Sequence, residues 1–177
     1  YYKTINPLKK VENQIEFVEA TSSELEQAID LADAAFPVYR ELPGRIRADF
    51  LRTIADEILN LGDDLINIYC QETGLPQGRA LGERGRTIFQ LKLFASVIEK
   101  ENWRKNIHEE AITEREPTPK PSLTKTHIPL GPIVVFGASN FPLAYSTAGG
   151  DTASALAAGC PVIVKSHPMH SGTGSII

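Results

Sequence analysis

The asparagine at position 140 has the side chain that most suggests chemistry in this sequence. It stands in "GASNFP", directly after the apolar run "IVVFGA" (133–138) and two residues before Pro142. A carboxamide offers N–H donors without a charge, and a fixed donor can stabilise an oxyanion that develops only during a reaction. Asn140 could instead cap a following helix, because asparagine is a preferred N-cap residue. The residues alone leave both roles open.

Other reactive side chains follow closely. Lys165 ends a second apolar run, and it could contact the ribose or phosphate of a nucleotide or simply face solvent. His167 and His170 stand three apart, and two imidazoles do not make a metal site without third and fourth ligands, so we expect no metal. Cys160 has no nearby base, which favours a buried structural thiol over a nucleophile.

The elements that would position these residues form a strand–helix–strand unit. The apolar runs 133–138 and 160–165 predict buried strands, and the Ala-rich stretch 142–159 predicts a helix that ends at Gly159. Continuous apolar strands belong to parallel sheets covered on both faces, and ligands bind at the carboxyl ends of such strands. The GxGxxG and P-loop patterns are absent from the unit, so we expect a cofactor to bind without a glycine-rich phosphate loop.

Helices and a ribbon are predicted before this unit, which makes the fold class α/β. Apolar spacing predicts four amphipathic helices, over 21–37, from Pro43, over 63–73 and over 77–100. Thr21 with Glu24, or Ser23 with Glu26, fits a capping box for the first of them. Glycines in the fourth suggest close backbone packing, at Gly78, Gly82 and Gly85.

A change of pattern follows the helices. Residues 111–116 and 122–129 are short, polar and β-leaning, with "PTPKP" (117–121) between them. They predict an exposed hairpin or ribbon, whose free strand edges would pair with a partner subunit.

Composition excludes several classes of protein. The 177 residues are 42% hydrophobic and 23% charged with a net charge of −4, so we expect no nucleic-acid partner. No run of 18 apolar residues predicts a membrane span, and no secretory signal opens the chain. Cys70 and Cys160 are far apart in apolar surroundings, which favours reduced, buried thiols in a cytoplasmic protein. The chain lacks an initial methionine and ends on "SGTGSII", so we expect the front portion of a longer protein.

The segment "PLGPIVVFGASNFPLAYSTAGGDTASALAAGCPVIVKSHPMHSGT" closely resembles the first βαβ unit of the NAD(P)-dependent aldehyde dehydrogenase superfamily. The resemblance lies in Pro-x-Gly before a strand, Asn-Phe-Pro, an Ala/Gly-rich helix and a strand that ends in lysine. The opening segment "NPLKKV" (6–11), the helices and the ribbon fit as well, so the resemblance covers essentially the whole chain. Within the superfamily, the sequence looks most like the α-ketoglutaric semialdehyde (2,5-dioxovalerate) dehydrogenases, and certain NADP-preferring fatty-aldehyde dehydrogenases look similar.

The resemblance implies the N-terminal part of an aldehyde dehydrogenase-like fold. Residues 1–110 would form the helical part of the cofactor-binding domain, 111–129 an oligomerisation β-ribbon, and 130–177 the first βαβ unit of a Rossmann-like parallel sheet. The resemblance therefore also implies a homo-oligomer joined through 111–129.

The implied reaction oxidises an aldehyde, here a semialdehyde, to a carboxylate. A cysteine thiolate attacks the aldehyde, hydride passes to NADP or NAD, and a glutamate-activated water hydrolyses the thioester. Asn140 falls on the family's oxyanion asparagine, and Lys165 on the lysine that contacts the adenosine ribose. The implied cofactor-binding residues are Phe136, Gly137, Ala138, Ser139, Asn140, Lys165, His167 and Pro168.

Two departures from the family pattern carry further expectations. Pro168 stands where many NAD-using members carry a glutamate that binds the ribose 2′-hydroxyl, so we expect NADP to be favoured. The family's nucleophilic cysteine and general-base glutamate lie beyond position 177, and neither Cys70 nor Cys160 matches the nucleophile's motif, so this chain alone should be inactive. The alternatives are another aldehyde dehydrogenase such as a fatty-aldehyde enzyme, a non-catalytic truncated assembly module, or an acyl-phosphate or acyl-CoA reductase that shares the fold.

Overall fold

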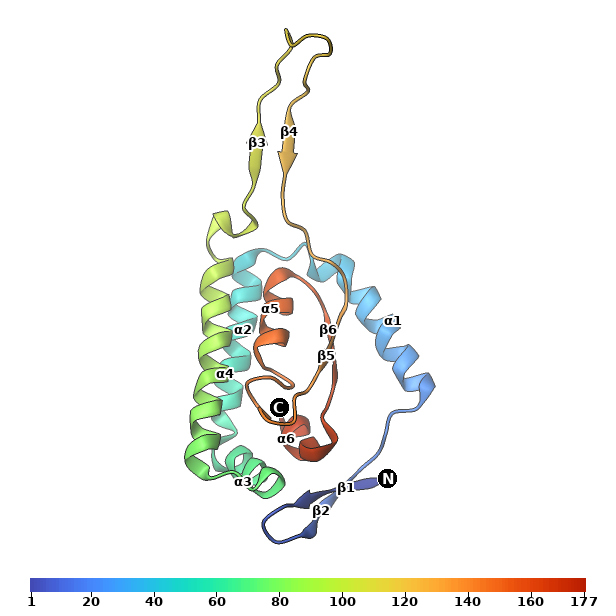
Figure 1. Cartoon of the computed structure of the whole chain (residues 1–177), viewed down its shortest axis with the longest axis vertical. Coiled ribbons are helices and arrows are strands. Elements are labelled where there is room, and N and C mark those ends of the chain that lie inside the picture. Colours follow the sequence, from blue (N-terminus) through green and yellow to red (C-terminus); the bar gives the residue numbers. More distant parts are fainter.

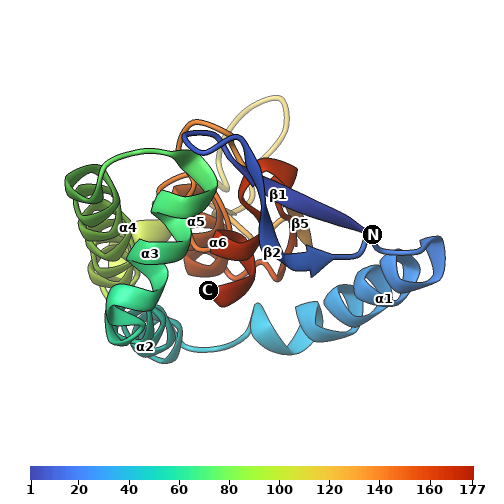
Figure 2. The same ribbon diagram turned by 90° about the horizontal axis from the view of Figure 1, so that it is seen from below.

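The computed structural model describes residues 1–177, except for the side chain of Glu101. In chain order the elements are β1 (Tyr2–Asn6), β2 (Val11–Phe17), α1 (Ser22–Tyr39), α2 (Gly44–Asn60), α3 (Gly62–Thr73), α4 (Gln77–Ile98), η1 (Glu101–Arg104), β3 (Ile107–Glu109), β4 (Leu123–Lys125), β5 (Ile133–Phe136), α5 (Gly150–Ala158), β6 (Val162–Lys165), η2 (Pro168–His170) and α6 (Ser171–Ile176). Figures 1 and 2 show the α/β arrangement, in which α2, α4 and α5 lie on one side of strands β5 and β6 and α1 lies on the other.

The four predicted helices are present near their predicted bounds. Helix α1 begins after Thr21, whose hydroxyl accepts the Glu24 N–H at 3.3 Å while the Glu24 carboxylate accepts the Thr21 N–H at 2.8 Å. This capping box therefore involves Thr21 rather than Ser23. The close packing expected at the glycines of α4 is absent, since a Cβ on Gly78, Gly82 or Gly85 would meet nothing within 4 Å.

The core lies among α2, α3, α4 and α5. Alanines on the facing sides of these helices let their backbones approach closely, and leucine and isoleucine side chains fill the space between them. The fully or almost fully buried apolar residues of this cluster include Ala48, Leu51, Ala55, Leu65, Ile66, Ala80, Leu91, Ala95 and Ala153.

Strands β5 and β6 pair in parallel, with Ile133 opposite Val162 and Phe136 opposite Lys165. Their carboxyl ends therefore lie level with each other. The side chains of Val134 and Phe136 on β5 remain 51% and 71% exposed. A groove of about 730 Å³ runs along this part of β5, and α5 forms its other wall.

The helix between these strands is shorter than predicted. It covers Gly150–Ala158, and residues 142–149 form a compact series of turns, so the prediction of a helix from Pro142 is wrong. The Leu143 amide bonds to a side chain of α4, and the Ala138 N–H bonds to the Tyr145 carbonyl at 2.8 Å. These contacts hold residues 142–149 in turns ahead of the helix.

The C-terminal end of α5 is held by two side chains from α1 and α2. The Tyr39 hydroxyl donates to the Leu156 carbonyl at 2.9 Å, and Arg47 Nε donates to the Ala157 carbonyl at 3.2 Å. Both carbonyls belong to the last turn, where helical partners are missing. Burial is the main cause that raises the pKa of Tyr39 to about 12. As predicted, the helix ends at Gly159, whose φ of 96° suits glycine.

The ribbon extends away from the body of the molecule (Figure 1). Strand β3 pairs antiparallel with β4, with Ile107 opposite Lys125. The predicted exposed hairpin is present, but its first strand lies before the β-leaning residues 111–116, where only Ile112 makes a bridge, to Lys120, and a turn follows it.

An N-terminal hairpin of β1 and β2 is present that the sequence patterns did not predict. Its turn is closed by the Asn6 side chain, which accepts the Leu8 and Lys9 N–H groups at 3.1 and 3.0 Å. The hairpin lies beside α3 and η2, and the Tyr2 and Ser171 hydroxyls are 2.8 Å apart. In the part of the chain that the structure describes, every helix is too short or too polar to cross a membrane.

Candidate active site

The loops that leave β5 and β6 meet at the carboxyl edge of the two-stranded sheet. The Gly137 N–H donates to the Lys165 carbonyl at 3.1 Å, and His170 Nε2 donates to the Ala138 carbonyl at 2.9 Å. A Cβ on Gly137 would lie 3.0 Å from Ser146 Oγ and 3.2 Å from the His167 backbone nitrogen, so a side chain here would crowd the second loop. The structure thus brings residues 136–138, which were predicted to bind the cofactor, close to Lys165 and to the residues that follow it.

Asn140 lies in an exposed turn of the first loop. Helix α5 has Gly149 at its N-cap and no side-chain cap, so the interpretation of Asn140 as a helix cap is wrong. Among the side chains that the structure describes, none hydrogen-bonds the Asn140 carboxamide, which leaves its N–H groups available. The role of Asn140 as an oxyanion donor stays a prediction.

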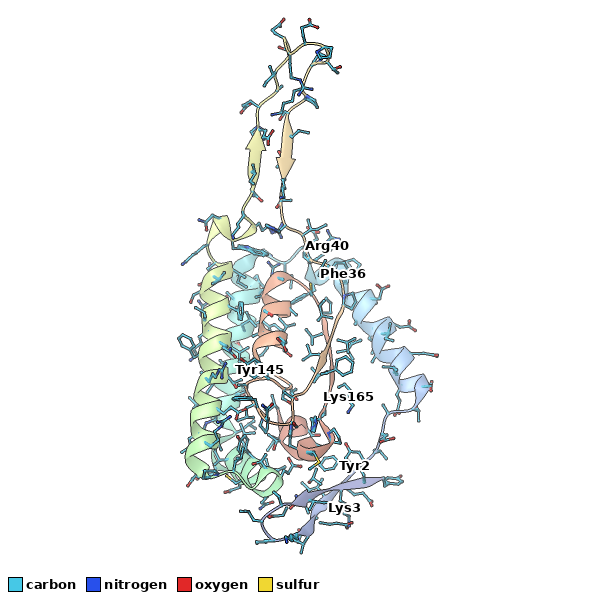
Figure 3. All side chains as sticks on the ribbon, in the orientation of Figure 1. Tyr2, Lys3, Phe36, Arg40, Tyr145 and Lys165 are labelled. Atoms are coloured by element: carbon cyan, nitrogen blue, oxygen red, sulfur yellow. The ribbon has the colours of Figure 1, made fainter. Side chains whose placement is uncertain are left out.

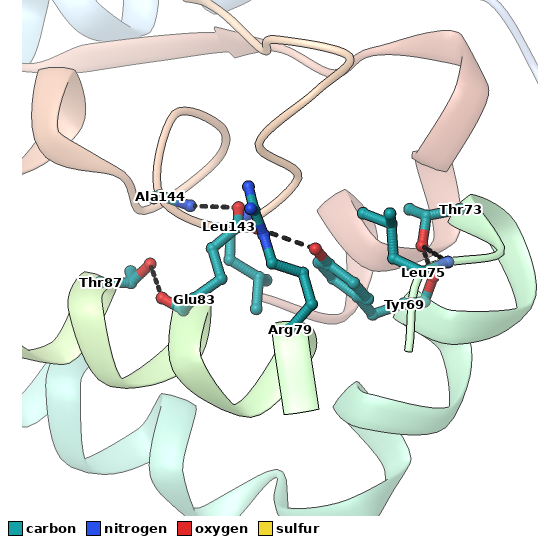
Figure 4. A network of polar contacts seen from close by, with 8 residues as sticks. All are labelled: Tyr69, Thr73, Leu75, Arg79, Glu83, Thr87, Leu143 and Ala144. Carbon is teal, nitrogen blue, oxygen red and sulfur yellow. Dashed lines mark hydrogen bonds and ion pairs between the residues drawn. The ribbon is translucent and has the colours of Figure 1, made fainter. Parts of the chain in front are cut away.

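Glu83 of α4 anchors the loop that carries Asn140 (Figure 4). Its Oε1 accepts the N–H groups of Leu143 and Ala144 at 2.8 and 3.0 Å, and its Oε2 accepts the Tyr69 hydroxyl at 2.8 Å. The Glu83 side chain is only 2% exposed. Burial first, and then the hydrogen bond to Glu83, raise the pKa of the Tyr69 phenol. The buried Glu83 carboxylate therefore fixes this loop at Leu143, three residues after Asn140.

Glu72 of α3 anchors the second loop in the same way. Its Oε1 accepts the Gly172 N–H at 2.8 Å, and its Oε2 accepts both the N–H and the hydroxyl of Thr173 at 2.7 Å. A Cβ on Gly172 would lie 2.8 Å from Glu72 Oε1 and 2.5 Å from Ile68 Cδ1, so these two side chains would have to shift to admit one. A negative charge at the first turn of α6 also suits the helix dipole.

The sequence analysis did not predict that Glu72 and Glu83 hold the two loops, although the position of each residue on its helix indicates such a role. Each carboxylate falls on the apolar stripe of its helix. Glu72 follows Leu65 and Tyr69 at helical spacing, and Glu83 precedes Leu91 on the buried face of α4. An acidic residue on an apolar stripe has to find hydrogen-bond donors inside the protein, because burial of an unpaired charge is costly.

Lys165 and the two histidines lie where β6 leads into the second loop. Lys165 is exposed at the end of β6. The rings of His167 and His170 stack with centroids 5.1 Å apart. His170 is fully buried, and its Nε2 carries the proton because its partner is a carbonyl oxygen. Burial, followed by the nearby His170 and Lys165, lowers the pKa of His167. The described residues contain no group of three or more His, Cys, Asp or Glu side chains that could hold a metal ion.

The cysteines lie away from these loops. Both are free thiols. Cys160 is buried as predicted, whereas Cys70 is only half-buried, contrary to the prediction, and burial raises its pKa. Cys160 precedes β6, and so lies at the opposite end of that strand from Lys165. The geometry therefore agrees with a structural role for Cys160 and places no thiol beside the loop of Asn140.

Comparisons with known proteins cover nearly the whole chain. The family model described as "Aldehyde dehydrogenase family" matches residues 1–177. The chain is 53% identical over 161 residues to alpha-ketoglutaric semialdehyde dehydrogenase 2 of Azospirillum brasilense, covering 91% of the chain and 31% of that protein. It is 47% identical over 161 residues to alpha-ketoglutaric semialdehyde dehydrogenase of Acinetobacter baylyi, with the same coverage of 91% and 31%. The chain thus spans under a third of the length of these relatives.

Solved structures show the same fold. Betaine aldehyde dehydrogenase from Staphylococcus aureus, in complex with NAD⁺, superposes with a TM-score of 0.79 at 23% identity, over 99% of this chain and 33% of that one. Aldehyde dehydrogenase 21 from Physcomitrella patens, in complex with the reaction product succinate, gives 0.78 at 22% identity, over 98% and 36%. These structures confirm the predicted fold class.

Proposed function

The chain belongs to the aldehyde dehydrogenase family, and from this premise we propose that the protein oxidises a semialdehyde, chiefly α-ketoglutaric semialdehyde, to a carboxylate with NADP or NAD. The substrate follows from the two relatives of that name, at 53% and 47% identity. The observation that carries the proposal is the exposed carboxamide of Asn140, on a loop that a buried carboxylate fixes at the carboxyl edge of a parallel strand pair.

Asn140 would act on the charge that forms at the substrate. As the aldehyde carbon becomes tetrahedral, its oxygen gains negative charge, and the Asn140 carboxamide donates a hydrogen bond to it. The Glu83 anchor keeps the donor in place before the reaction begins, so little reorganisation is needed during it. Neither Cys70 nor Cys160 is placed to attack the aldehyde, so the nucleophile of the proposed reaction is not among these residues.

The second loop fits a nicotinamide dinucleotide. The cofactor supplies the hydride acceptor when it is bound. The exposed ammonium of Lys165 is suited to the adenosine ribose or its phosphate, and the backbone of 136–139 lies beside it at the same edge. Pro168 is exposed three residues after Lys165 and has no charge that would repel a 2′-phosphate. We therefore favour NADP over NAD, and a strong preference for NAD in kcat/KM would contradict this part of the proposal.

The test of the catalytic role is Asn140→Ala in the full-length protein. We expect kcat to fall by about 10²–10³-fold, as for the loss of one oxyanion donor, with a smaller change in the KM of the aldehyde. Asn67→Ala, at an exposed site on α3, is the matched control and should keep wild-type turnover. Turnover near the wild-type value in Asn140→Ala would show that the carboxamide is not the oxyanion donor.

We further propose that the protein forms a homo-oligomer through residues 111–129 and acts in the cytoplasm. The ribbon exposes apolar side chains at about half of their surface, including Ile112 at 49% and Leu123 at 50%. A two-stranded ribbon with such a surface is marginal alone. The two free thiols suit a reducing compartment. Sedimentation of a variant with Ile112→Lys and Leu123→Lys tests the first point, and an unchanged oligomeric state would contradict it.

A further inference from the structure

Two aromatic rings follow Asn140 on its loop and stack with arginines of α4. Phe141 and Tyr145 meet edge to face, with ring centroids 5.3 Å apart. The Arg86 guanidinium lies 5.0 Å from the Tyr145 centroid and 5.7 Å from that of Phe141, and its Nη2 donates to the Tyr145 hydroxyl at 2.6 Å. Arg79 lies 4.6 Å from the Phe141 centroid. Figure 3 labels Tyr145 on the loop that faces α4.

The charges of the arginines on this helix are balanced to different degrees. Arg79 Nε lies 3.5 Å from the Glu83 carboxylate. Arg84 is turned toward α3, where its Nη1 donates to the Gly62 carbonyl at 2.9 Å. Arg86 has no carboxylate within ion-pair distance among the described side chains. Arg86 is therefore an exposed guanidinium without a counter-charge, beside the loop of Asn140.

The Arg86 side chain is also ordered before any ligand arrives. Its hydrogen bond to Tyr145 and the two rings fix the guanidinium plane, while only one of its five N–H donors is used by that bond. Such a planar, fixed group matches the two oxygens of a carboxylate, and little side-chain entropy remains to be lost on binding.

We propose that Arg86 binds the carboxylate at the far end of the substrate and thereby selects aldehydes that carry one. The inference rests on the proposed function, since it assigns part of the same substrate site. The aldehyde and carboxylate carbons of an extended five-carbon semialdehyde lie about 5 Å apart, from single-bond lengths of about 1.5 Å. Arg86 lies 5.7 Å from the ring of Phe141, the residue directly after Asn140, so it is a close neighbour of the loop that carries the carboxamide. The proposal thus assigns the aldehyde end of the substrate to Asn140 and the carboxylate end to Arg86.

The competing explanation is that the arginine and the rings only stiffen the loop. Two substrates of equal length separate the explanations, because succinic semialdehyde carries a carboxylate and butanal does not. In the full-length protein, Arg86→Gln should lower kcat/KM for succinic semialdehyde by about 10- to 150-fold, the value of one charge-assisted hydrogen-bonded pair. Its kcat/KM for butanal should stay within about twofold of wild type. An equal loss for both substrates, or no loss for succinic semialdehyde, overturns the proposal.

Matched variants sharpen the result. Arg84→Gln removes the same charge from the same helix on a different face, and it should leave the ratio of the two kcat/KM values unchanged. Arg86→Lys keeps the positive charge but lacks the planar guanidinium. It should therefore retain part of the preference for succinic semialdehyde that Arg86→Gln loses.

A binding measurement separates this inference from the proposed function. Succinate should raise the melting temperature of the wild-type full-length protein and should do so much less for Arg86→Gln. If the wild type oxidises neither aldehyde but succinate still stabilises it through Arg86, the proposed oxidation fails and the carboxylate site stands. Equal stabilisation of the two proteins by succinate, or none of either, overturns the carboxylate site.

Discussion

Replacement of Glu83 by alanine should release the loop that carries Asn140. The substitution leaves three buried donors without an acceptor, namely the Leu143 and Ala144 amides and the Tyr69 hydroxyl. Each unsatisfied buried donor costs about 1–3 kcal/mol, so the loss reaches roughly 3–6 kcal/mol once partial entry of water is allowed for. Glu83→Gln keeps one oxygen for the two amides and loses mainly the charge, which reduces the cost to about 1–2 kcal/mol.

The assay is hydrogen exchange of the Leu143 and Ala144 amides in the full-length protein. A loss of 3 kcal/mol in local stability speeds their exchange by about 100-fold, and Glu83→Gln should lie between Glu83→Ala and wild type. We also expect kcat to fall in the same order, because the donor on Asn140 is no longer held. Glu57→Ala, at an exposed position of α2, is the control. If the Leu143 and Ala144 amides of Glu83→Ala exchanged at the same rate as in the wild-type protein, the idea that this carboxylate holds the loop would be refuted.

Three further predictions concern the stability of the fold. Gly172→Ala should lower the free energy of unfolding by about 1–3 kcal/mol in urea denaturation, since its Cβ would press against Glu72 and Ile68; an unchanged midpoint would contradict the crowding. Tyr39→Phe should cost about 1 kcal/mol, measured from the melting temperature, because it removes one hydrogen bond to the end of α5. The lowered pKa of His167 means that the unfolded chain takes up its proton first, so stability should fall as the pH drops below about 6.5, and His167→Gln should weaken that dependence.

The sequence predicted elements whose signals are local. Helical spacing, the Thr21 capping box and the apolar strands belong to short stretches, and each appears in the structure. The predicted burial of β5 on both faces is wrong, because Val134 and Phe136 are exposed. The start of α5 was misjudged because residues 142–149 favour a helix locally, while Glu83 binds the Leu143 amide from 60 residues away. A tertiary contact of this kind leaves no trace in the pattern of the loop itself.

The N-terminal hairpin was missed for a different reason. In β1 the polar residues Thr4 and Asn6 are buried, whereas the apolar Ile5 is 51% exposed. The usual rule that alternating apolar residues face the core therefore points to the wrong side of this strand. Within the candidate site, Asn140 and Lys165 were proposed from their places at strand ends together with the family resemblance. Arg86 was not, because its significance depends on Tyr145, 59 residues further along the chain.

The two anchoring carboxylates precede their loops in the chain, by 60 residues for Glu83 and by 100 for Glu72. During synthesis from the N-terminus, the helices that bear them are therefore complete before the loops leave the ribosome. Contacts so distant in sequence form late, because a long segment must be closed before they yield any energy. The strand edge that carries Asn140 and Lys165 is therefore expected to be the last part of this chain to become ordered, after the helices that hold its loops.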